Sequence, residues 1–244
     1  MPKVIKSVIA IVKHSLLKKH KDIESNLPES FTYTAHTGCV GTKENSLESI
    51  ECGVLNGADI VEFDLNFTSE GEPVLSHDEP KGREITLDEA FRKISEYKSL
   101  KVNVDVKSTV ALGKVKALAE KHHILDRIFY TGIGEDFVEA VQRDTPNIPY
   151  YLNVGVEKNQ SEEYLYSLVK KVKDCGAVGI NFNKDNATKK LVDVFHGNGL
   201  LVSIWTVSNT ADIYRILSYS PDNITTRRPD KIKKILSKKK TDKI

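Results

Sequence analysis

Residues 57–78 have the sequence GADIVEFDLNFTSEGEPVLSHD, and the prediction of the fold starts from this stretch. Between Ile60 and Thr68, apolar and polar side chains alternate, which is typical of a strand with one face against an apolar core. A shorter extended segment is expected at Glu72–Ser76, after a turn. Before the strand, Glu44–Asn56 has helical character and ends at Gly57. Residues 44–78 therefore predict a helix, a strand and an extra extended segment in succession.

The same alternation of strands and helices continues through the rest of the chain. Eight principal strands are expected, at residues 31–38, 60–68, 101–106, 127–131, 150–154, 178–182, 201–207 and 224–226. A helix is expected after each of them, at residues 44–56, 87–97, 110–123, 136–143, 162–174, 188–197, 211–219 and 231–239. Strict alternation implies a parallel sheet with right-handed crossovers, and eight units at this length favour a closed (β/α)8 (TIM) barrel. No linker-like segment divides residues 31–244, so they are expected to form one barrel domain.

The composition of the 244 residues excludes several classes of protein. Hydrophobic residues make up 39% and charged residues 29% of the chain, which excludes disordered and fibrous proteins. The net charge of +2 gives no indication of a nucleic-acid partner. Cys39, Cys52 and Cys175 cannot all pair and lack metal-type spacing, which favours a reducing, cytoplasmic location. No apolar run reaches the roughly 18 residues that a membrane span needs.

Residues 1–30 are expected to form an N-terminal extension with a basic amphipathic helix. Val4, Val8, Ile9, Val12 and Leu16 recur at helical spacing among several lysines, and no signal-peptide cleavage site follows. Such a helix either packs across the open end of the barrel, which we favour, or lies on an anionic membrane surface as a peripheral contact. The sequence does not indicate an oligomeric state.

Side chains that can carry chemistry fall at the ends of the expected strands. In a barrel, the carboxyl ends of the strands form one mouth, where catalytic groups gather. Seven residues are expected to ring it: His36, Glu62, Asp64, His77, Asp105, Lys107 and Trp205. The two-residue spacing of Glu62 and Asp64 places them on one face of their strand. A simpler interpretation is that these carboxylates face the helices and that Asp105 and Lys107 form an ordinary ion pair.

The predicted cluster of carboxylates suggests a metal site. Three converging carboxylates repel one another unless a cation or a proton intervenes, and one lysine offsets only part of their charge. Ligands that are all oxygen suit a hard divalent ion, Mg²⁺ or Ca²⁺. His36 and His77 would flank that ion, and because imidazole titrates near neutrality, we favour an acid–base role for them over metal ligation.

Several stretches resemble the glycerophosphodiester phosphodiesterase family. They are Ala35–Gly38 (AHTG), Glu44–Ser46 (ENS), Gly57–Asp64 (GADIVEFD) and Ser69–Asp78 (SEGEPVLSHD), with weaker matches at Asn103–Lys107, Trp205–Asn209 and Thr225–Asp230. The resemblance covers nearly all of the chain beyond residue 30. It implies a (β/α)8 enzyme that hydrolyses phosphodiesters, such as glycerophosphocholine, to glycerol 3-phosphate and an alcohol.

The resemblance also implies a role for individual residues. His36 and His77 match the general acid–base positions, and Lys107 that of a catalytic cation facing the phosphate. Glu62, Asp64 and Asp105 match the ligands of one divalent cation. Three residues match positions that contact the substrate: Glu44, a polar residue near the site, Trp205, an aromatic wall, and Thr37, which stands where the family usually has arginine.

The chain departs from the family pattern in three places. Besides Thr37, Asp105 stands where the family commonly has glutamate, and only Glu79–Ile85 replaces the usual inserted subdomain. The short insertion and the Asp-x-Lys motif are also similar to sphingomyelinase D-type phospholipases, but those are secreted and disulfide-bonded. Two alternatives stay open: a phospholipase D-like enzyme that acts on lysophospholipids at a membrane surface, and a catalytically weak protein that binds phosphodiesters.

Overall fold

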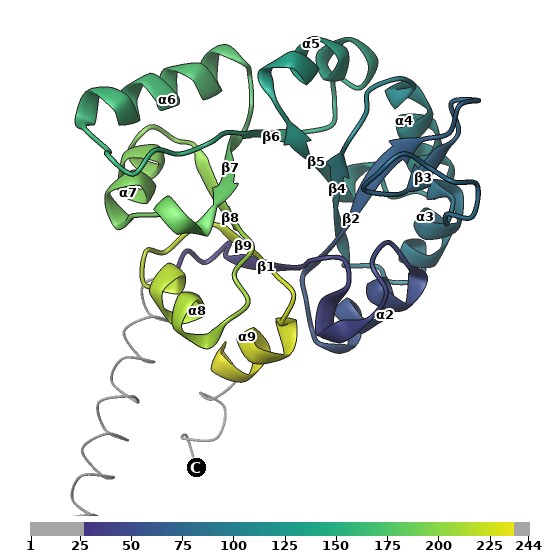
Figure 1. The fold of residues 1–244 in the computed structure, drawn as a ribbon, viewed down its shortest axis with the longest axis horizontal. Helices are drawn as coiled ribbons and strands as arrows, with labels where there is room; N and C mark the ends of the chain where they lie inside the picture. Colours follow the sequence, from purple (N-terminus) through teal and green to yellow (C-terminus); the bar gives the residue numbers. More distant parts are fainter. Residues whose placement is uncertain (1–26, 237–244) are drawn as a thin grey trace, which may run out of the picture.

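In a computed structural model of the protein, eight parallel strands close into a barrel (Figure 1). The structure describes residues 27–236, and most of the predicted N-terminal extension lies outside them. The barrel strands are β1 (Thr32–Ala35), β2 (Ile60–Phe67), β4 (Lys101–Val106), β5 (Ile128–Ile133), β6 (Tyr150–Asn153), β7 (Gly179–Asn183), β8 (Leu201–Trp205) and β9 (Asn223–Thr226). Each strand pairs in parallel with the next, and β1 closes the barrel by pairing with both β9 and β2. The predicted (β/α)8 fold is confirmed.

A helix follows each barrel strand and covers the outside of the barrel (Figure 1). The helices are α2 (Leu47–Leu55), α3 (Leu87–Ser95), α4 (Leu112–Lys121), α5 (Glu135–Asp144), α6 (Glu162–Asp174), α7 (Lys189–Gly197), α8 (Thr210–Leu217) and α9 (Pro229–Leu236). Thr86 and Glu89 form a capping box at the start of α3. None of the helices within residues 27–236 is long and apolar enough to cross a bilayer.

One predicted boundary differs from the structure in a way that matters for the site. The helix expected from Glu44 begins at Leu47, because the Ser46 side chain accepts a hydrogen bond from the Ser49 backbone and caps it. Glu44 therefore lies in the loop that follows β1, where its side chain is free to face the mouth of the barrel.

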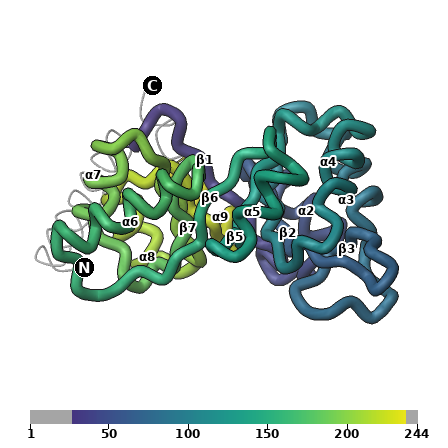
Figure 2. The backbone as a smooth tube through the Cα atoms, turned by 90° about the horizontal axis from the view of Figure 1, so that it is seen from above, coloured from purple at the N-terminus to yellow at the C-terminus, as the bar shows by residue number. Residues whose placement is uncertain are grey.

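The extra extended segment is β3 (Pro73–Leu75), which pairs antiparallel with the end of β2. The β3 segment lies at one end of the molecule and α6 to α8 lie at the other (Figure 2). Only ten residues, Ser76–Ile85, connect β3 to the cap residue of α3. The expected absence of an inserted subdomain at this point agrees with the structure.

The packing of β2 decides which of its side chains reach the inside of the barrel. Phe63 packs against Phe91 of α3, with 6.3 Å between the ring centroids. At Gly53 of α2, a Cβ atom would lie 2.8 Å from that of Ala35 and 2.9 Å from a methyl of Val61, so this helix sits directly on β1 and β2. The odd-numbered residues of β2 thus face the helices. Because side chains alternate along a strand, Glu62 and Asp64 face the barrel interior.

Candidate active site

A cavity of about 480 Å³ opens at the carboxyl ends of the barrel strands. All nine residues predicted for the site line it: His36, Thr37, Glu44, Glu62, Asp64, His77, Asp105, Lys107 and Trp205. Eight further residues complete its lining: Asn103, Val106, Thr131, Gly132, Asn153, Asn181, Thr225 and Arg227. Its size is within the usual range for a small-molecule site.

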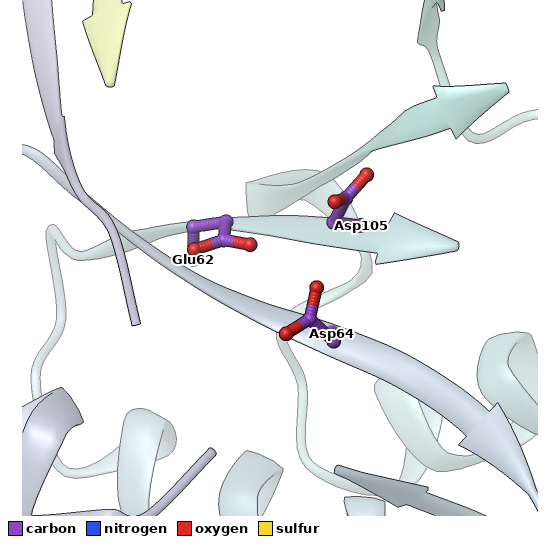
Figure 3. Close-up of side chains that lie close together, drawn as sticks. All are labelled: Glu62, Asp64 and Asp105. Carbon is purple, nitrogen blue, oxygen red and sulfur yellow. The ribbon is translucent and has the colours of Figure 1, made fainter. Parts of the chain in front are cut away.

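Three carboxylates converge on one side of this cavity. In the parallel register of β2 and β4, Asp64 lies opposite Asp105, and Glu62 lies one inward-facing position below Asp64. The three side chains gather at adjacent strands in Figure 3, and one oxygen of each lies within 4.8 Å of the others. Glu62 and Asp64 are each only 5% exposed. Their spacing would allow one small cation to contact all three.

Lys107 bridges two of these carboxylates. Its ammonium nitrogen lies 3.0 Å from Asp64 Oδ1 and 2.7 Å from Asp105 Oδ2. Burial alone would lower the pKa of Lys107, but the charges of Asp105 and Asp64 outweigh it and raise that pKa above its usual value. Lys107 therefore carries a positive charge at any physiological pH.

Glu62 is the most deeply enclosed of the three acids. Its Oε2 accepts a hydrogen bond of 2.8 Å from the backbone N–H of Thr37 and lies 3.7 Å from His36 Nδ1. Burial raises the pKa of Glu62 to about 7; the charges of Asp64 and Asp105 reinforce the shift, while His36 and the Thr37 N–H oppose it. Without a compensating cation, the third negative charge of the cluster is therefore costly.

The loop before α2 fixes the position of Asp64. Asn45 adopts a left-handed backbone conformation, with φ of 53°. Its side-chain amide donates to Asp64 Oδ2 at 2.9 Å, and its Oδ1 accepts from the Asp64 backbone N–H at 3.0 Å. The Thr37 hydroxyl accepts from the Asn45 backbone N–H at 2.6 Å. Thr37 is only 1% exposed, so this hydrogen bond gives its side chain a positioning role, and its contact with substrate stays a prediction.

Both histidines of the cavity are anchored through Nδ1. His36 Nδ1 lies 2.8 Å from the carbonyl oxygen of Thr37, and His77 Nδ1 lies 2.8 Å from Asp78 Oδ1. A carbonyl or carboxylate oxygen can only accept, so each Nδ1 carries the proton. Nε2 is then the nitrogen that can exchange a proton. By contrast, Nε2 of His122 and of His196 contacts a carboxylate outside this cavity.

Arg227 is a site residue that the sequence reasoning missed. It follows β9, and its guanidinium lies 2.5 Å from Glu44 Oε1 in the lining of the cavity. Gly38 adopts a φ of 73°, and a Cβ atom there would lie 2.7 Å from Glu44 Cγ, so glycine leaves room for this pair. The signal was present in the family-like stretch Thr225–Asp230, but nothing in that stretch indicated a partner for Arg227.

The glycerophosphoryl diester phosphodiesterase family model matches this chain over residues 24–98 and 80–231. The chain belongs to this family. A Bacillus altitudinis protein named glycerophosphodiester phosphodiesterase is 22% identical, and the match covers 82% of this chain and 96% of the relative. A Bacillus subtilis protein of the same name is 20% identical over 85% of this chain and 87% of its own length.

Solved structures share the fold. An Oleispira antarctica phosphodiesterase in complex with the product sn-glycerol-3-phosphate has a TM-score of 0.71 and 18% identity; the match covers 88% of this chain and 98% of that one. Glycerophosphodiester phosphodiesterase from Agrobacterium tumefaciens has a TM-score of 0.67 and 16% identity, with 84% of this chain and 99% of the other covered.

Proposed function

We propose that this protein hydrolyses glycerophosphodiesters to glycerol 3-phosphate and an alcohol. The observation that carries the proposal is that three carboxylates, Lys107 and two histidines with available Nε2 atoms line one cavity. Family membership and the product named for the similar Oleispira antarctica phosphodiesterase support it.

Glu62, Asp64 and Asp105 would hold one divalent cation, Mg²⁺ or Ca²⁺. Their oxygens are the hard donors that these ions prefer, and the three ligand atoms lie within 4.8 Å of one another. The charge also fits, because three carboxylates and Lys107 leave two negative charges for a divalent ion to balance. A bound ion would stabilise the charge that develops on the phosphate oxygens.

The remaining steps fall to side chains of the chain itself. Lys107 and Arg227 would orient the phosphate and offset its charge, while Trp205 packs against the carbon skeleton of the substrate. One of His36 and His77 takes the proton of the attacking oxygen as the new P–O bond forms. The other donates a proton to the alcohol oxygen as the old P–O bond breaks. The attacking oxygen belongs either to water, which gives glycerol 3-phosphate directly, or to the glycerol hydroxyl of the substrate, which gives a cyclic phosphate that water then opens.

Product analysis tests this function. The purified full-length protein is incubated with Mg²⁺ or Ca²⁺ and either glycerophosphocholine, glycerophosphoinositol or a lysophospholipid. We expect glycerol 3-phosphate from a glycerophosphodiester and at least 100-fold less from the matched variant His36→Gln. If the head group were released from the lysophospholipid and neither glycerophosphodiester were hydrolysed, the result would instead support the phospholipase D-like alternative. Binding without any product would support the alternative of a weak phosphodiester-binding protein.

A further inference from the structure

A second cavity of about 440 Å³ adjoins the catalytic one. The two share Asn153, Asn181 and Trp205, at the carboxyl ends of β6, β7 and β8. Of these strands, β7 and β8 lie across the barrel from β2 and β4, which carry the three carboxylates (Figure 1). A phosphodiester held at the carboxylates would therefore extend one of its two alcohol groups toward this second cavity.

The lining of the second cavity is rich in amides and contains a single charged side chain. Besides Trp205, it contains four asparagine side chains, those of Asn153, Asn181, Asn183 and Asn186. Its one carboxylate, Asp185, already pairs with Lys184 at 2.7 Å. The lining contains no lysine, arginine, histidine or glutamate. Such a surface offers hydrogen bonds and one aromatic face, and its one negative charge is already paired with a lysine outside the lining.

Hydrogen bonds fix the direction of these amides. Asn153 Oδ1 accepts from the Gly132 backbone N–H and from Asn181 Nδ2, each at 3.0 Å, so the Asn153 amide nitrogen is left as a donor. Asn183 Oδ1 accepts from the Asp185 N–H at 3.0 Å, which leaves the Asn183 amide nitrogen as a second donor. The amide nitrogen of Asn186 donates to the Val156 carbonyl at 2.8 Å and joins the two walls of the cavity.

Two buried polar atoms lie on residues at the junction of the cavities. Asn181 Oδ1, on a side chain that is only 5% exposed, and Trp205 Nε1 have no hydrogen-bond partner among the described residues. Buried acceptors and donors are rarely left unmatched, because each costs free energy to desolvate. A hydroxyl group both donates and accepts a hydrogen bond, so a ligand with several hydroxyls matches this mixture of donors and acceptors.

We propose that the second cavity is the subsite for the alcohol group of the substrate and that it selects a neutral polyhydroxylated alcohol. The carbon face of such an alcohol would pack on Trp205, and its hydroxyls would pair with the asparagine amides. A quaternary ammonium alcohol such as choline is a poorer match, because its recognition relies on several aromatic faces or an unpaired negative charge. This inference rests on the proposed hydrolysis of glycerophosphodiesters.

Steady-state kinetics of the full-length protein test the subsite with two substrates that share the glycerol 3-phosphate group. We expect kcat/KM for glycerophosphoinositol to exceed that for glycerophosphocholine by at least about tenfold. This is the factor expected when one or two additional hydrogen bonds to the substrate are formed. Asn183→Asp keeps the acceptor for the Asp185 N–H but removes the outward donor and adds a charge. It should lower the ratio of the two kcat/KM values at least fivefold, mainly through KM for glycerophosphoinositol.

The matched control is Asn159→Asp, which makes the same change of charge. Asn159 is exposed and lines neither cavity. It should leave the ratio unchanged. An equal or higher kcat/KM for glycerophosphocholine in the parent protein would overturn the inference, as would equal effects of Asn183→Asp on both substrates. In either case the proposed function would stand, because both substrates are hydrolysed. Glycerol 3-phosphate from neither substrate would overturn the proposed function and the subsite together.

Discussion

Asn45 and Asp64 are joined by two reciprocal hydrogen bonds, one from the Asn45 amide to Asp64 Oδ2 and one from the Asp64 backbone N–H to Asn45 Oδ1. Because the Asn45 amide occupies Oδ2, Asp64 Oδ1 remains available to contact Lys107 or a metal cation. The second hydrogen bond fixes the loop after β1 against β2. Asn45 thus acts on the proposed metal site through Asp64 and is a positioning residue.

Asn45→Gly is expected to weaken divalent-ion binding about 10–100-fold, the usual cost of removing a group that orients a ligand. Glycine tolerates the φ of 53°, so the change removes the amide without straining the loop. Calorimetric titration with Mg²⁺ or Ca²⁺ measures the effect. Asn56→Gly, at the end of α2 and outside the cavity, is the control. Equal affinities for the Asn45 variant and the parent would exclude this positioning role.

Replacing either His36 or His77 with alanine is expected to lower kcat/KM on the order of 100-fold or more, because each would transfer a proton through Nε2. The parent protein should show a bell-shaped pH profile whose limbs belong to the pair as a whole. His122→Ala is the matched control, since that histidine contacts Asp88 outside the cavity. Losses below threefold at both positions would contradict the acid–base assignment.

Arg227→Gln is expected to raise KM for a glycerophosphodiester about 10–100-fold, because a charge-assisted hydrogen bond to phosphate is worth about 1.5–3 kcal/mol. The neighbouring Arg228→Gln provides the control: Arg228 pairs with Asp230 and does not line the cavity. Initial-rate measurements on the two variants distinguish a local role of Arg227 from a general loss of positive charge. Similar KM values for both variants would show that Lys107 holds the phosphate without Arg227.

The raised pKa of Glu62 predicts how the stability of the metal-free protein depends on pH. The folded chain keeps the Glu62 proton up to a pKa of about 7, whereas an unfolded glutamate releases it near 4.5. Within this window the folded state binds more protons, so the free energy of unfolding should fall as the pH rises. Glu62→Gln cannot ionise and should lack this component. Urea unfolding in the presence of a chelator, at several pH values across the window, measures the free energy of unfolding of the parent and of the variant. If this free energy depended on pH in the same way in both proteins, the raised pKa of Glu62 would be contradicted.

Much of the fold could be predicted from local patterns. The alternation in Ile60–Thr68 predicts both the strand and the face that carries Glu62 and Asp64, because side-chain direction in a strand has a period of two. The capping box at Thr86 and Glu89 sets the start of α3 within the sequence itself. Since all parallel strands of a barrel end at one mouth, the order of the elements was enough to predict that site residues distant in the sequence lie close together.

Other features depend on contacts that no local pattern specifies. Arg227 meets Glu44 only because β9 closes the barrel against β1. Asn45 reaches Asp64 through a left-handed turn that the Thr37 hydroxyl holds in place. The barrel interior is also more polar than the branched aliphatic filling common in this fold: Thr34, Ser203 and Asn223, for example, form a hydrogen-bonded group.

The central claim is that Glu62, Asp64 and Asp105 hold a divalent cation that hydrolysis requires. The most direct test is the rate of glycerol 3-phosphate release as a function of free Mg²⁺ or Ca²⁺, for the parent protein and for Asp105→Asn. We expect no release in excess chelator, saturable recovery as the ion is added, and a recovery curve for Asp105→Asn that is displaced to higher ion concentrations. Full activity of the parent in excess chelator, or identical curves for both proteins, would contradict the claim.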